Sequence, residues 1–158
     1  MRHLTGVDLN YEHAKEARDR KCYDRVIVGD VDAILRPEDN ASEQSVSYDL
    51  IYACDLLPYL KNLEDLFRTA KTGLERRGGI FAFSAEIMDE PLDESTGYAL
   101  QSCARYCHKS WMIEKLVKDF EFDVLAFTRP APALREHDGK DVSGAMIVLK
   151  QQPQQSRL

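Results

Sequence analysis

Residues 4–10 read LTGVDLN, a short apolar segment that carries an aspartate, Asp8, near its C-terminal end. This pattern predicts a strand, and the stretch that follows, YEHAKEARDRK at 11–21, is rich in helix formers. The same order returns further along, because a second apolar segment, DRVIVGDV at 24–31, closes on another acid, Asp30. Only MRH comes before residue 4. The sequence therefore opens on a strand, a helix and a second strand.

The middle of the chain continues this alternation. Two more apolar segments, YDLIYACDLL at 48–57 and GIFAFSAE at 79–86, are predicted strands. Between them, residues 63–77 place apolar side chains at helical spacing, and the glycine pair at 78–79 ends that helix. Residues 36–47 are polar and rich in helix breakers, so they are predicted to form a surface loop.

The C-terminal part has a different pattern. Residues 87–97 are acidic and loop-like, and a helical region is predicted after them, with KSWMIEKLVKDF at 109–120 as its clearest part. Two strands, FDVLAFTRPAPAL at 122–134 and SGAMIVLK at 143–150, follow with a turn at Gly139 between them. Because no helix joins these strands, we expect them to pair antiparallel.

These elements predict one α/β domain over residues 1–150, with a parallel sheet that ends in an antiparallel hairpin. Residues 151–158, QQPQQSRL, are predicted to be a disordered tail. Ligands of open parallel sheets bind beyond the carboxyl ends of the strands. That rule selects four positions: Asp8 with Leu9, Asp30 with Val31, Cys54 with Asp55, and Ser84 with Glu86.

The composition excludes several classes of protein. The 158 residues are 44% hydrophobic and 30% charged, as is usual for a globular domain. The net charge of −6 and the pI of about 5.2 argue against non-specific nucleic-acid binding, which needs a basic surface. No apolar run reaches the length that crosses a bilayer, so we expect no membrane span.

The cysteines give no sign of a disulfide framework or a metal site. Cys22, Cys54, Cys103 and Cys107 form no CxxC pair, which predicts reduced thiols and a cytoplasmic location. Cys103, Cys107 and His108 suggest metal ligation, but residues four apart also share one face of a helix. No second pair of ligands completes a tetrahedral site, so we expect no metal.

Several segments, in their order along the chain, resemble class I S-adenosylmethionine-dependent methyltransferases. GVDLN, the GD at 29–30, YDLIYACDLLPYL and GLERRGGIFAFSAE match the cofactor-side segments of that family, and LREHDGKDVSGAMIVL looks like its C-terminal hairpin. GYALQSCARYCHKSWMIEKL is similar to a bacterial-type subgroup sometimes fused to tetratricopeptide repeats. The resemblance implies a Rossmann-like fold and transfer of a methyl group from S-adenosylmethionine to a small-molecule or protein acceptor.

The resemblance also implies roles for the first two strand ends. Asp8 would accept hydrogen bonds from both ribose hydroxyls, since a carboxylate offers two acceptor oxygens. Leu9 would pack against the adenine face, while Asp30 would accept from the adenine amino group with Val31 beside the ring. Asp8 is otherwise explained as a helix N-terminal cap, and Asp30 as a turn acid.

On the substrate side, the resemblance implies that Cys54 and Asp55 border the methionine end and the transferred methyl group. Four more residues are candidates near the acceptor: Tyr98, Arg105, Tyr106 and His108. His108 or Tyr98 would take a proton from an acceptor that arrives protonated. Arg105, with Tyr106, would bind the substrate, for example at an acidic group, or Arg105 would simply lie in solvent.

One part of the family's pattern is missing. In that family a strand and a glycine-rich turn precede the segment that matches GVDLN, and the turn cradles the methionine part of the cofactor. MRHL cannot supply them, and no GxG occurs in the chain. We therefore expect a sheet that lacks its first βα unit, weak cofactor binding by these 158 residues, and unpaired strand edges that favour a homodimer.

Two other classes of function stay open. A non-catalytic methyltransferase-like module that binds a protein partner is consistent with the missing first unit. A nicotinamide-dependent oxidoreductase also has an acid at its second strand end, although the final antiparallel hairpin argues against it. Cofactor binding separates the enzyme from the non-catalytic module.

Overall fold

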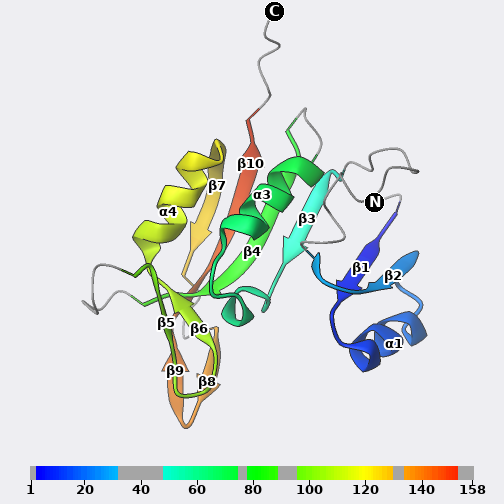
Figure 1. The fold of residues 1–158 in the computed structure, drawn as a ribbon, viewed down its shortest axis with the longest axis horizontal. Coiled ribbons are helices and arrows are strands. Elements are labelled where there is room, and N and C mark those ends of the chain that lie inside the picture. The colour runs from blue at the N-terminus through cyan, green and yellow to red at the C-terminus, as the bar shows by residue number, and fades with distance from the viewer. Residues whose placement is uncertain (1–2, 32–47, 75–77, 89–95, 130–133, 153–158) are drawn as a thin grey trace, which may run out of the picture. The chain divides into compact units, whose positions relative to one another are not determined.

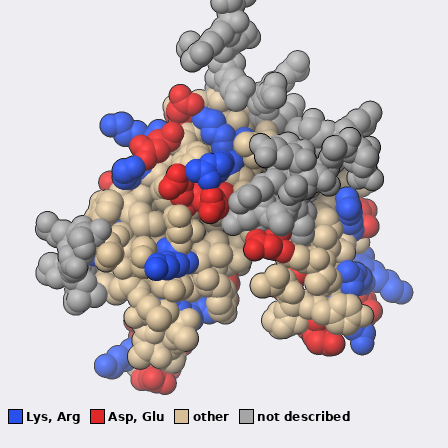
Figure 2. All heavy atoms as spheres, viewed as in Figure 1, with Lys and Arg blue, Asp and Glu red and all other residues tan. Residues whose placement is uncertain are grey.

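The computed structural model describes residues 3–31, 48–74, 78–88, 96–129 and 134–152. Contacts within the chain divide it into two compact units, Met1–Val46 and Ser47–Leu158, and each unit is described by itself. None of the described helices is long and apolar enough to span a membrane. The face drawn in Figure 2 carries both acidic and basic side chains.

The first unit is a βαβ arrangement. Strands β1 (Thr5–Asp8) and β2 (Arg25–Val28) pair in parallel, and helix α1 (Tyr11–Asp19) connects them. Asn10 caps the helix, because its side-chain oxygen accepts hydrogen bonds from the backbone N–H groups of Glu12 at 2.8 Å and of His13 at 3.4 Å. The predicted strand–helix–strand order of residues 4–31 is confirmed.

The second unit is built on a four-stranded sheet. Its strands are β3 (Leu50–Ala53), β4 (Ile80–Glu86), β10 (Gly144–Gln151) and β7 (Phe122–Thr128), in that spatial order. β3 and β4 run parallel, whereas β10 pairs antiparallel with both β4 and β7. The parallel sheet with an antiparallel end is therefore confirmed, and β10 lies between β4 and β7.

Two helices cover one face of this sheet, α3 (Glu64–Gly73) and α4 (Ser110–Asp119) (Figure 1). Side chains alternate along β4, so that Phe81 and Phe83 point to the helical face and are fully buried. Phe67 of α3 meets both rings edge-on, at centroid distances of 5.5 and 5.6 Å. This aromatic cluster anchors α3 to the sheet.

Two short hairpins extend from the end of this unit where β4 finishes (Figure 1). One joins β5 (Tyr98–Leu100) to β6 (Tyr106–His108), and the other joins β8 (Arg135–His137) to β9 (Lys140–Val142). Gly139 turns the second hairpin with a φ of +71°, as the HDGKD motif predicts. A short 3-10 helix, η2 (Leu57–Tyr59), follows β3.

The structure corrects one prediction, since residues 98–108 form a hairpin and not a helix. This hairpin pairs Tyr98 with His108 and Leu100 with Tyr106, and the spacing of apolar residues in the sequence does not distinguish such pairs from a helix. Ala104 has a φ of +58°, which breaks any helix there. Cys107 therefore lies on a strand and does not share a helix face with Cys103.

Two boundaries also differ or stay outside the structure. β10 runs to Gln151, whose side chain is buried, so the strand enters the first position of the predicted tail. The rest of that tail from residue 153, the loop predicted at 36–47 and most of the acidic loop predicted at 87–97 lie outside the described residues.

Candidate functional site

The carboxyl ends of β3 and β4 bring two of the predicted strand-end positions together. The strands pair in parallel with Ala53 opposite Phe83, so the residues that follow them lie at one edge of the sheet. The backbone N–H of Asp55 donates to Ser84 Oγ at 2.9 Å and ties the two ends. Asp55 and Glu86 are the acidic residues of this edge.

Asp55 has an unusual backbone. Its φ of +56° lies in the left-handed region, which costs energy for residues other than glycine, although aspartate tolerates it better than most. Its side chain is 70% exposed and is held by Arg105. Backbone strain of this kind is often found at functional sites, and here it directs an exposed carboxylate beyond the end of β3.

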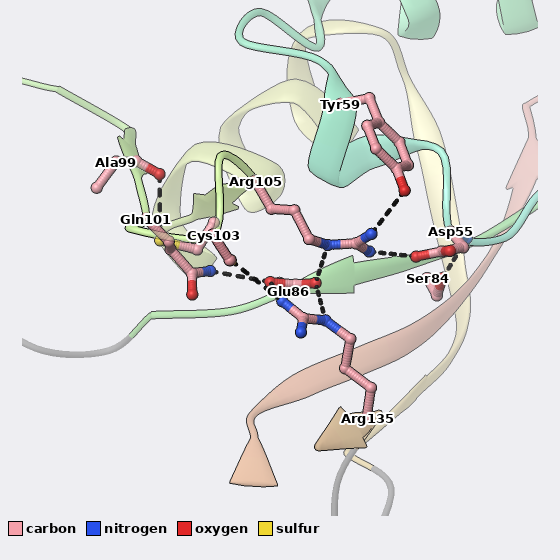
Figure 3. A network of polar contacts seen from close by, with 10 residues as sticks. Asp55, Tyr59, Ser84, Glu86, Ala99, Gln101, Cys103, Arg105 and Arg135 are labelled. Carbon is pink, nitrogen blue, oxygen red and sulfur yellow. Dashed lines mark hydrogen bonds and ion pairs between the residues drawn. The ribbon is translucent and has the colours of Figure 1, made fainter. Parts of the chain in front are cut away.

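Glu86 is the centre of a buried polar network (Figure 3). It is only 2% exposed, and its Oε1 accepts from Arg105 Nε at 2.8 Å and from Arg135 Nε at 2.7 Å. Its Oε2 accepts from Gln101 Nε2 at 2.9 Å and from Arg135 Nη2 at 3.2 Å. Burial alone would raise the pKa of Glu86, but the two arginines outweigh it and hold that pKa below its ordinary value.

Arg105 links this network to the end of β3 (Figure 3). Besides its bond to Glu86, its Nη2 donates to Asp55 Oδ1 and its Nη1 donates to the Tyr59 hydroxyl at 2.7 Å. The guanidinium also lies 4.8 Å from the centre of the Tyr59 ring. All three nitrogens of Arg105 are therefore engaged by the protein, and the guanidinium fixes the position of the Asp55 carboxylate.

Arg135 reaches the network from the second hairpin. Its Nη2, which bonds Glu86, also lies 3.6 Å from Cys103 Sγ in the turn of the first hairpin. Glu86 thus holds both hairpins against the end of β4. Three members of the network, Tyr59, Gln101 and Arg135, were not predicted from the sequence, because no short-range spacing connects residues 15 to 49 positions apart.

His108, a predicted proton acceptor, is fully buried at the end of β6. Its Nε2 lies 3.0 Å from the Leu60 carbonyl, which fixes the proton on Nε2 as the donor, and its Nδ1 has no partner among the described residues. Burial lowers the pKa of His108, so the ring is neutral. It contacts Leu60 and the protein interior, and not solvent.

The other two predicted residues of this hairpin, Tyr98 and Tyr106, lie on a half-buried face. Their rings meet edge-on with centroids 5.9 Å apart. Lys61 Nζ lies 5.6 Å from the centre of the Tyr98 ring, in a cation–π arrangement. Tyr98 is therefore more accessible than His108.

In the first unit, the predicted adenosine ligands lie at the carboxyl ends of β1 and β2. Asp8 Oδ1 accepts from the Asn10 backbone N–H at 2.7 Å, and its Oδ2 lies 3.6 Å from His13 Nδ1. The carboxylate is partly exposed, which leaves lone pairs for further donors. Leu9, beside it, is 75% exposed.

Asp30 is exposed just after β2, and Val31, half-buried, follows it. Because β1 and β2 run parallel, Asp8, the last residue of β1, and Asp30, just after β2, lie at the same edge of this strand pair. Two carboxylates beside the exposed apolar Leu9 match the chemistry of an adenosine group, which has ribose and amino donors around a flat ring. The residues present therefore fit the adenosine half of the implied cofactor.

No known family model matches the sequence, and no curated protein matches it. Several solved structures have a similar fold. An S-adenosylmethionine-dependent methyltransferase from Methanosarcina mazei is 14% identical, with a TM-score of 0.64 over 93% of this chain and 81% of that protein. The N-methyltransferase NodS from Bradyrhizobium japonicum, solved with S-adenosyl-L-homocysteine, is 12% identical, with a TM-score of 0.62 over 94% of this chain and 66% of NodS.

The cyclase SpnF also has this fold, at 13% identity and a TM-score of 0.69 over 94% of this chain and 66% of SpnF. At these identities the likeness shows the fold alone. The chain has the mixed α/β, Rossmann-like fold of the class I S-adenosylmethionine-dependent methyltransferases.

Proposed function

We propose that the chain is an S-adenosylmethionine-dependent methyltransferase, or the C-terminal portion of one, whose acceptor is a small molecule or a protein side chain. The observation that carries the proposal is the pair of acids at the carboxyl ends of β1 and β2, beside an exposed leucine, in a chain with a methyltransferase fold. NodS, one of the proteins with this fold, was solved with S-adenosyl-L-homocysteine.

When bound, S-adenosylmethionine supplies the sulfonium methyl group that an acceptor attacks. On our proposal Asp8 binds the ribose hydroxyls, Leu9 packs on the adenine, and Asp30 with Val31 recognises the edge of the ring. Cys54 and Asp55 border the methyl group.

On the acceptor side, we propose that Tyr106 contacts the substrate and that Arg105 positions Asp55, since its guanidinium already bonds Asp55, Tyr59 and Glu86. Between the two predicted proton acceptors, the half-buried Tyr98 is better placed than His108, which is fully buried. A general base is needed only if the group that accepts the methyl arrives protonated.

Nuclear magnetic resonance titration of the ¹⁵N-labelled chain tests the cofactor site even at millimolar affinity. Adenosine and S-adenosylmethionine should both shift the amides of Leu9 and Val31, because the residues identified bind the adenosine half. Replacing Asp8 with Asn keeps an acceptor for the Asn10 N–H but removes the charge. This should weaken binding by about tenfold to a hundredfold, as expected for hydrogen bonds to a charged group.

The matched control is Asp19→Asn, a change to another aspartate at the end of α1. Asp19→Asn should leave the affinity unchanged. Equal affinities for the wild type and Asp8→Asn would refute the role of Asp8, and a lack of shifts at Leu9 and Val31 would refute the site.

Methyl transfer needs a separate assay, because SpnF, a cyclase, has a similar fold and the fold alone does not fix the reaction. Radiolabelled methyl transfer to a library of small molecules and peptides tests the reaction. Binding without transfer to any acceptor would favour the non-catalytic methyltransferase-like module.

A further inference from the structure

The outer edge of the second unit exposes a continuous apolar surface. Val124, Leu125 and Phe127 of β7 are 54%, 56% and 42% exposed. Between β7 and α4 lies an open hollow of about 140 Å³, whose apolar lining includes Ile113, Val117 and Ile147. We call this surface, residues 113–117 of α4 with residues 124–127 of β7, the α4–β7 edge.

The strand itself has an open side. β7 is the last strand in the order β3-β4-β10-β7, and no described strand pairs with its outer side. Exposed apolar edge strands tend to associate, and natural proteins usually protect them with charges or cover them. Along the seven residues of β7 the only charged side chain is Asp123.

We propose that two copies of this chain associate through their α4–β7 edges, about a two-fold axis that sets the two β7 strands antiparallel. A two-fold interface must be self-complementary. This edge offers an exposed leucine, Leu125, and the open apolar hollow beside α4, and we place the Leu125 of each copy in the hollow of the other. A cavity of roughly 150 Å³ holds a benzene-sized group, so one leucine side chain fits the hollow.

The charges at the two ends of β7 favour a second copy of the chain as the partner, with its β7 strand running antiparallel. Asp123 is the second residue of β7 and Arg129 directly follows its last residue, so antiparallel strands bring the Asp123 of each copy to the Arg129 of the other. Within one copy Asp123 Oδ1 accepts from Gln152 Nε2 at 2.8 Å and Arg129 Nη2 donates to Ser110 Oγ at 3.4 Å, so the contact between copies would add to these bonds. Parallel strands would instead oppose like charges. One charged residue, Glu114, also lines the hollow.

In this dimer the two copies contact each other through side chains more than through a continuous ladder of backbone hydrogen bonds between the two β7 strands. The pairing of β7 with β10 shifts register between Val148 and Leu149, which leaves Leu125 without a partner on β10. A bulge of this kind bends an edge strand and interrupts regular pairing across it. Leu125, at this bulge, is 56% exposed.

Sedimentation velocity of the full 158-residue chain over a concentration series tests the association. The wild type should show a concentration-dependent monomer–dimer equilibrium, and Leu125→Asp should raise the dimer dissociation constant by roughly tenfold or more. The control is Leu100→Asp, at an equally exposed leucine on β5 (61%), which should leave the equilibrium unchanged. A wild type that stays monomeric, or a dimer that Leu125→Asp does not weaken, overturns the proposal.

A charge exchange tests the antiparallel arrangement. Asp123→Lys and Arg129→Glu should each weaken the dimer, because each opposes like charges twice across the axis. The double variant restores both pairs and should recover most of the wild-type affinity. A double variant weaker than either single variant would overturn the antiparallel arrangement.

Discussion

Replacing Glu86 with Gln should destabilise the second unit, because Glu86 holds three elements together at 2% exposure. A glutamine keeps one acceptor oxygen, but its amide N–H groups would face donors, Gln101 Nε2 and Arg135 Nη2, that now bond the carboxylate. Removing one partner of a fully buried ion pair costs about 3–5 kcal/mol. Arg105 keeps Asp55 and Tyr59, and Arg135 is partly exposed, so we expect a loss of about 2–3 kcal/mol.

The assay is urea unfolding followed by tryptophan fluorescence. Trp111 is the single tryptophan of the chain, and it lies on α4 of the second unit, so its signal reports on that unit. Glu136→Gln is the matched control, since Glu136 is exposed on β8 beside Arg135. Glu136→Gln should change the free energy of unfolding by less than about 0.5 kcal/mol. A loss of that small size for Glu86→Gln would refute the structural role of Glu86.

The pH dependence of stability in acid provides a second test of Glu86. The pKa of Glu86 is below 4.5 in the folded protein, so the unfolded chain takes up this proton at a higher pH than the folded chain. The stabilisation by Glu86 is therefore complete above pH 4.5 and is lost as the pH falls through the lower folded value. Glu86→Gln should remove this part of the acid sensitivity.

Three further changes test other parts of the structure. Burial lowers the pKa of His108 from 6.5, so as the pH falls the unfolded chain takes up this proton before the folded chain does. The free energy of unfolding should therefore fall as the pH drops below 6.5. His108→Gln, which keeps a donor for the Leu60 carbonyl, should flatten that pH dependence in the same urea experiment. Gly144→Ala should cost about 1–3 kcal/mol, because a Cβ there would lie 2.6 Å from the Ala85 carbonyl oxygen, whereas a wild-type melting temperature would contradict the packing around β10. Asn10→Ala removes the cap of α1 and should cost about 1 kcal/mol, seen as faster hydrogen exchange in α1 but not in α3.

The sequence predicted the elements whose signals are local. Each strand of the β1–β2 pair and of the four-stranded sheet coincides with an apolar run, and the acids or cysteine at the carboxyl ends of β1, β2 and β3 are where the alternation of strand and helix predicts them. The turn was also predicted correctly, since Gly139 takes the positive φ that the HDGKD turn requires.

The features that the sequence did not predict depend on which residues pair with each other, and local spacing does not give that information. The hairpin at 98–108 was predicted as helix, because apolar residues four apart suit either structure until the pairing partner is known. The network around Glu86 joins the ends of two strands, a 3-10 helix and two hairpins, and none of these meet through periodic spacing. His108 was predicted to act on protons, yet nothing in its local sequence indicates complete burial beside Leu60.

The place of β10 has a consequence for how the second unit is made. β10 is the last strand of the unit to leave the ribosome, but it pairs with β4 on one side and β7 on the other. Until residues 144–151 have emerged, β7 has no neighbour among the described strands and one edge of β4 is open, so this sheet closes only after β10 has emerged. The β10–β4 pairs join residues 58 to 70 positions apart, from Gly144 with Glu86 to Lys150 with Ile80, which slows folding and exposes apolar edges meanwhile. Nascent chains that end before Gly144 should therefore be bound by chaperones, and released chains that include Gln151 should not.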